Sequence, residues 1–94
     1  MNNLLSEKDN EAVLDILVEQ IGVQRTQLLP DAKIEADLGA DSLTVIEIVL
    51  AVEERFKLSL PDERVENVVT VADLQELLAD MLQEQKQPVS PAKS

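Results

Sequence analysis

Apolar side chains recur at helical spacing in three stretches of the chain, approximately residues 7–21, 42–56 and 71–84. Residues three and four positions apart share one face of an α-helix, so each stretch presents an apolar stripe to a core. A shorter helix is expected over residues 61–67, because a proline suits the first helical position and the two acids after it favour the positive end of the helix dipole. The pattern predicts an all-α fold, an antiparallel bundle of three main helices with one short helix before the last.

Residues typical of helix ends stand at the predicted boundaries. Ser6 and Asp9 resemble a capping box before the first helix, and Thr70 and Asp73 repeat that pattern before the last. Gly22 is suited to end the first helix, since glycine adopts the left-handed conformation without steric cost. These local signals agree with the apolar periodicity and therefore strengthen the predicted helix limits.

The connection over residues 23–40 is long for a compact domain. Its leucines and isoleucine are expected to pin it onto the core: Leu28, Leu29, Ile34 and Leu38. Its acids do not form a calcium loop of the EF-hand type. Counted from Asp31, the third, sixth and twelfth positions hold Lys33, Ala36 and Ser42, where that loop needs an oxygen ligand, a glycine and a glutamate. We therefore predict no metal site here.

Composition narrows the classes of function. The 94 residues include neither cysteine nor histidine, which excludes disulfides, metal sites built on these residues and catalytic triads that use imidazole. The net charge of -11 disfavours direct binding to nucleic acid or to anionic membranes, and favours partners with basic patches. No apolar run is long enough to span a bilayer, and the N-terminus lacks the pattern of a signal peptide. We expect a single cytoplasmic domain.

The second helix carries more apolar surface than one core face requires. At about 100° per residue, its core-facing arc consists of Val45, Ile48, Val49, Val52 and Phe56. A neighbouring arc, here called the apolar strip, consists of Leu43, Ile46 and Leu50, with acids beside it. Either the helix is buried on two sides, or the apolar strip is an exposed docking surface with an acidic rim.

The stretch 38–43, with the sequence LGADSL, leads into this helix. Gly39 permits backbone angles that other residues avoid, and Asp41 is a favoured N-cap residue. Ser42 then falls in the first turn, where its hydroxyl points toward solvent. Taken alone, the stretch is a glycine-containing loop with a cap. Because the chain has no histidine to activate a serine, we expect Ser42 to be a substrate of another enzyme and not a nucleophile.

This string, followed by Glu47, Glu53 and Glu54, resembles the phosphopantetheine attachment site of acyl carrier proteins, and the resemblance extends over residues 11–82. It implies that Ser42 carries a covalent 4′-phosphopantetheine arm from coenzyme A, whose thiol holds acyl groups as thioesters. It also implies that Asp41 matters to the phosphopantetheinyl transferase. The protein would then be a carrier and not an enzyme.

The resemblance further implies where partners and acyl chains bind. Acyl-transfer and chain-elongation enzymes with basic patches would dock on the second helix, through Leu43, Ile46, Glu47, Leu50, Glu53 and Glu54. The acyl chain would lie in a cleft matched by Val49, Leu60, Val65 and Val68, which from the sequence alone are simply core residues. We expect a monomer with a carrier domain at residues 1–84 and a disordered tail at residues 85–94.

Two positions leave the pathway open. Thr44 and Arg55 stand where the common bacterial fatty-acid pattern has acids, so a polyketide or other specialised pathway fits as well as fatty-acid synthesis. Ala40 and Asp41 before the serine are more similar to acyl carriers than to peptidyl carriers. An unmodified acidic adaptor, which binds a basic partner through the second helix, is the alternative from another class of function. Unlike a carrier, it should be unaffected when Ser42 is replaced by alanine.

Overall fold

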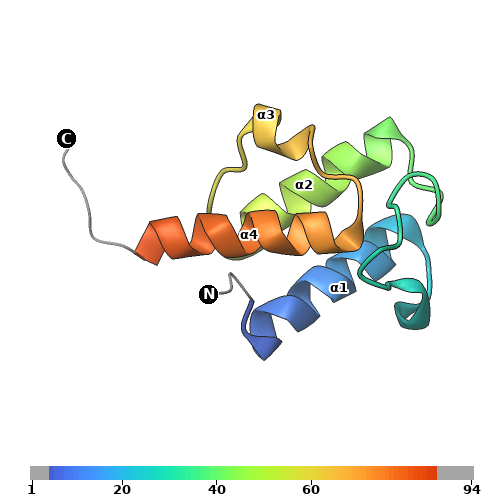
Figure 1. Cartoon of the computed structure of the whole chain (residues 1–94), viewed down its shortest axis with the longest axis horizontal. Helices are drawn as coiled ribbons and strands as arrows, with labels where there is room; N and C mark the ends of the chain where they lie inside the picture. The colour runs from blue at the N-terminus through green and yellow to red at the C-terminus, as the bar shows by residue number, and fades with distance from the viewer. Residues whose placement is uncertain (1–4, 87–94) are drawn as a thin grey trace.

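The computed structural model describes residues 5–86 and contains the predicted helices in the predicted order. They are α1 (Glu7–Ile21), α2 (Ser42–Phe56), α3 (Asp62–Val65) and α4 (Val71–Lys86). In Figure 1, α1 runs opposite to α2 and α4, and the short α3 lies in the crossover that joins α2 to α4. The all-α bundle of three main helices and one short helix is confirmed. α4 ends two residues later than predicted, and residues 87–94 of the expected tail lie outside the described residues.

The predicted caps form as hydrogen bonds. The Ser6 hydroxyl accepts from the Asp9 backbone N–H at 3.1 Å, and Gly22 ends α1 in the left-handed conformation with φ of 85°. Before α4, the Thr70 hydroxyl accepts from the Asp73 N–H at 3.1 Å, while the Asp73 carboxylate accepts from the Thr70 N–H at 3.1 Å. These contacts satisfy backbone donors that a helix leaves unpaired at its start, which explains why the helices begin where they do.

The hydrophobic core forms where the three long helices meet. Its largest completely buried side chains come from all three of these helices: Val13, Leu17, Ile48, Val52, Val71 and Leu78. Each buried methylene contributes roughly 0.8 kcal/mol to the hydrophobic stabilisation. The core-facing arc of α2 is therefore set by packing against α1 and α4, and this fixes which arc of α2 is left for solvent.

The connection between α1 and α2 differs from the prediction in two ways. It contains a short 3₁₀ helix, η1 (Arg25–Gln27), which no sequence pattern predicted. The Arg25 guanidinium pairs with Asp15 at 3.0 Å and also with Glu11, so η1 is held against α1. Leu28, Ile34 and Leu38 are buried as predicted, but the prediction for Leu29 is wrong, because its side chain is 57% exposed. Leu29 begins a turn closed by the Ala32 N–H on the Leu29 carbonyl, and that turn directs it outward.

Backbone hydrogen bonds join this connection to the segment that leads into α4. The Ile34 N–H donates to the Val69 carbonyl at 2.9 Å, the Val71 N–H donates to the Ala32 carbonyl at 3.0 Å, and the Ala72 N–H donates to the Pro30 carbonyl at 2.9 Å. We call this set the backbone clamp. It fixes the loop that precedes Ser42, and it brings residues 32–36 beside residues 68–70, which are far apart in the sequence.

Candidate functional site

Ser42 is the first residue of α2, and its side chain is exposed. The loop before it turns through Gly39, which has a φ of 80°, a left-handed conformation that favours glycine. Ala40 beside it is buried, and its N–H donates to the Ile34 carbonyl at 3.1 Å. The loop is thus anchored to the core through Ala40 and leaves the Ser42 hydroxyl accessible at the N-terminal end of α2.

Asp41 acts as the N-cap of α2, as predicted. One carboxylate oxygen accepts from both the backbone N–H and the hydroxyl of Thr44, each at 2.9 Å. The hydrogen bond from the Thr44 N–H, followed by that from its hydroxyl, holds the pKa of the Asp41 carboxyl below its usual value. A negatively charged carboxylate is thereby held in a fixed position next to Ser42. The sequence pattern marks Thr44 only as a position where an acid is usual, whereas the structure shows that its hydroxyl donates to the capping carboxylate.

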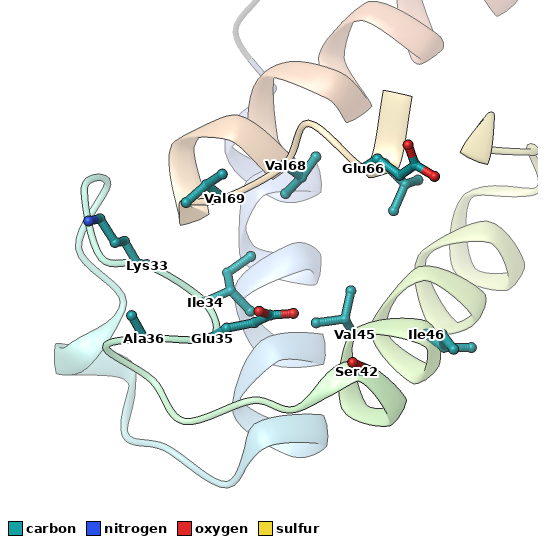
Figure 2. Close-up of a pocket in the computed structure, with 11 residues that line it drawn as sticks. Lys33, Ile34, Glu35, Ala36, Ser42, Val45, Ile46, Glu66, Val68 and Val69 are labelled. Atoms are coloured by element: carbon teal, nitrogen blue, oxygen red, sulfur yellow. The ribbon is translucent and has the colours of Figure 1, made fainter. Parts of the chain in front are cut away.

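A cavity of about 470 Å³ opens beside Ser42 (Figure 2). It lies between the start of α2, the loop at residues 33–36 and the segment from the end of α3 to Val69. Most of its lining side chains are aliphatic: Ile34, Ala36, Val45, Ile46, Val65, Val68 and Val69. Cavities of this size and apolar lining are typical of sites that bind small organic groups. The cavity therefore offers an apolar environment to a group attached near Ser42.

The cavity contains only part of the cleft expected from the sequence. Val65 and Val68 line it together with Ser42, whereas Val49 and Leu60 do not. Val49 is partly buried against the core and Leu60 is only 4% exposed. Sequence reasoning missed Ile34 and Val45 as cavity residues, because it assigned both to the core on their apolar character alone. The position of a residue in the sequence could not show that the loop held by the backbone clamp forms one wall of the cavity.

The apolar strip of α2 is exposed. Leu43, Ile46 and Leu50 are 62%, 54% and 57% exposed, which excludes a helix buried on two sides within the described residues. Glu47 and Glu54 are exposed beside the strip. Ile46 belongs both to the strip and to the lining of the cavity. A macromolecule that covered the strip would therefore lie at the opening of the cavity and next to Ser42.

Glu53 differs from the other acids of α2. Its carboxylate accepts from the Leu60 N–H at 2.7 Å, in partly buried surroundings. The Leu58 N–H also donates to the Glu53 backbone carbonyl at 3.1 Å. Glu53 thus holds the connector between α2 and α3, a contact that its exposed neighbour Glu54 does not share. Glu53 therefore has a structural role in addition to the contact with partner enzymes that is expected of it.

The described helices give no indication of a membrane-spanning segment, since none within residues 5–86 is long and apolar enough to cross a bilayer.

Arg64 of α3 pairs with Asp80 of α4 at 3.1 Å. This contact ties the short helix to the last one and so keeps Val65 at the wall of the cavity. The site is therefore built from a capped helix, a clamped loop and a tethered short helix.

Comparison with known proteins agrees with this geometry. Residues 11–78 match the family model described as "Phosphopantetheine attachment site", and that attachment implies a covalently bound 4′-phosphopantetheine. The chain is 40% identical over 70 residues to an acyl carrier protein of Helicobacter pylori, a match that covers 74% of this chain and 90% of that protein. It is 45% identical over 67 residues to an acyl carrier protein of Syntrophobacter fumaroxidans, a match that covers 71% of this chain and 83% of that protein. The chain therefore belongs to the acyl carrier protein family.

Proposed function

We propose that Ser42 is the residue to which the 4′-phosphopantetheine arm is attached, and that the protein delivers acyl groups on this arm to partner enzymes. The observation that carries the proposal is the position of the Ser42 hydroxyl, exposed at the first residue of α2 and on the edge of an apolar cavity. The arm supplies a thiol, which the chain lacks because it contains no cysteine.

The residues around Ser42 fit such a group. The exposed Ser42 side chain leaves space for a transferring enzyme, and the Asp41 carboxylate beside it is already bound by Thr44. Because the two hydrogen bonds from Thr44 hold the Asp41 carboxylate in place, it presents a fixed negative charge to a basic group of the transferase. The chain has no histidine that could activate Ser42. We therefore assign Ser42 the role of an acceptor and not that of a catalytic nucleophile.

The exposed apolar strip supports the proposal that partner enzymes dock on α2. Leu43, Ile46 and Leu50 supply apolar contact area, and the exposed Glu47 and Glu54 supply negative charge for enzymes with basic patches. We place Glu53 in this set with a smaller direct contribution, because its carboxylate is already bound to Leu60 N–H. Both fatty-acid synthesis and a specialised acyl or polyketide pathway are compatible with this surface.

The proposed function is tested by intact-mass measurement after incubation with coenzyme A and a broad-specificity phosphopantetheinyl transferase. We expect the wild-type chain to gain one phosphopantetheine group and Ser42→Ala to gain none. Ser59→Ala is the matched control, because Ser59 is also exposed but lies in the connector after α2 and does not line the cavity. This control should be modified like the wild type.

Two outcomes would contradict the assignment. If Ser42→Ala were modified, another residue would carry the arm. If the folded wild type were not modified while a control carrier was, the chain would act as an unmodified acidic adaptor, and the apolar strip would be the surface to examine for a basic partner.

A further inference from the structure

The cavity beside Ser42 contains one feature that its apolar lining does not require. Three ionisable residues contribute to the lining, Lys33, Glu35 and Glu66. Figure 2 shows the Lys33 ammonium and the Glu66 carboxylate directed away from the centre of the cavity, while the Glu35 carboxylate is directed across it toward Val45. Within residues 5–86, no hydrogen bond or ion pair engages the Glu35 carboxylate. A negative charge without a partner therefore faces the space next to Ser42.

We propose that Glu35 makes this cavity select for neutral acyl groups, hydrocarbon or hydroxylated, and against acyl groups that end in a carboxylate. The proposal rests on the proposed attachment of the arm at Ser42, which places the acyl chain close to the cavity. Ser42 itself lines the cavity, so the attached chain is the occupant that the geometry favours.

The selectivity follows from charge and solvation. An aliphatic chain that enters the cavity loses contact with water and gains contact with the valines and isoleucines of the wall, which is favourable in proportion to the apolar area buried. A carboxylate at the end of the chain would lose part of its hydration and would meet the Glu35 charge at short range. A hydroxyl group, in contrast, can donate a hydrogen bond to the Glu35 carboxylate. Neutral chains therefore occupy the cavity, and carboxylated chains remain in solvent.

The carrier with its arm attached provides the test. It is loaded with an octanoyl group or with the ω-carboxylated analogue of the same chain length, and the loaded thioester is verified by intact mass. Urea unfolding at room temperature and pH 7, followed by circular dichroism, compares each loaded form with the free-thiol form. A chain that occupies the cavity binds only the folded state and raises the urea midpoint. We expect the octanoyl form to unfold at a higher midpoint than the carboxylated form, by about 0.5 M, since exposed charge interactions are modest and the slope for a small domain is low.

Glu35→Gln should raise the midpoint of the carboxylated form and remove most of this difference, while it leaves the octanoyl form nearly unchanged. Glu19→Gln is the matched control, because it removes the same charge from an exposed position of α1 that does not line the cavity. This control should retain the difference. High salt should also reduce the difference in the wild type, because it screens partly exposed charges.

Three results would overturn the inference. Equal midpoints for the two loaded forms would show that Glu35 does not discriminate. A higher midpoint for the carboxylated form would show that attraction to the Lys33 ammonium outweighs repulsion from the Glu35 carboxylate. A midpoint for the octanoyl form equal to that of the free thiol would show that the cavity does not hold the chain at all. In each case the intact mass still reports that the arm is attached, and Ser42→Ala still identifies the residue that carries it, so failure of this inference is distinguishable from failure of the proposed function.

Discussion

Replacement of Glu53 by alanine should destabilise the fold, although Glu53 lies among the acids that face partner enzymes in our proposal. The substitution removes the carboxylate that accepts from the Leu60 N–H at 2.7 Å and leaves that donor without its partner in partly buried surroundings. A hydrogen bond to a charged group contributes roughly 1.5–3 kcal/mol to stability. For a domain of this size, each kcal/mol corresponds to a Tm change of about 4–8 °C.

Urea and thermal unfolding followed by circular dichroism measure this effect, with Glu54→Ala as the matched control. Glu54 is adjacent in sequence and exposed, so its replacement should change the free energy of unfolding by no more than about 0.5 kcal/mol. Glu53→Gln keeps an acceptor oxygen without the charge and should fall between the two. Equal stability of the Glu53→Ala and Glu54→Ala variants would refute the structural role of Glu53. If that role is correct, weaker partner binding by Glu53→Ala reports a displaced connector as well as a lost docking contact.

Other predictions concern the core, the caps and the charge of the molecule. Leu78→Ala should lower the free energy of unfolding by about 2–5 kcal/mol. Leu43→Ala should lower it by no more than about 0.5 kcal/mol, because the Leu43 side chain is 62% exposed. Similar losses for the two variants in urea unfolding would contradict the assignment of Leu78 to the core and of Leu43 to the apolar strip. Hydrogen bonds from the Val69 and Thr70 N–H groups lower the pKa of Asp73 in the folded state. The ionised Asp73 carboxylate therefore contributes its full stabilisation above the unfolded-state pKa of about 4, and this contribution disappears as the pH falls through the lower folded-state pKa. Asp73→Asn should therefore reduce the difference in stability between pH 5 and pH 3 relative to the wild type, and an unchanged difference would exclude this carboxylate as a source of acid sensitivity. The acids clustered over residues 31–66 should repel one another at low salt, so added salt or a divalent cation should raise the Tm; no rise in either condition would show that this repulsion is negligible.

The sequence predicted those features that depend on near neighbours in the chain. The start of α2 at Ser42 followed from an aspartate placed three residues before the donor it caps, and the end of α1 followed from Gly22. Each of these signals is complete within a few residues, so no knowledge of the tertiary structure was needed.

Features that depend on distant segments were missed. The role of Glu53 depends on Leu60, whose amide reaches its carboxylate only after the chain turns at the end of α2. The cavity walls depend on the backbone clamp between Ile34 and Val69, since main-chain hydrogen bonds leave little trace in the side-chain pattern. Val49 and Leu60 were expected in the cleft because the family resemblance implied it, whereas the cavity of this chain is lined by Val65 and Val68 and not by these two residues.

The backbone clamp also has a consequence for how the cavity can open. Residues 34 and 69 stand on two of its walls, and the hydrogen bond between them would have to break if these walls separated. Near Val45 and Val65 the cavity is lined by aliphatic side chains of α2 and α3, which can slide past one another without loss of a side-chain hydrogen bond. The connector before α3 is bound at Leu60 to Glu53, and α3 itself is bound at Arg64 to Asp80. The expected motion is therefore a small pivot of this short helix relative to α2, while the loop and the start of α4 move as one rigid unit.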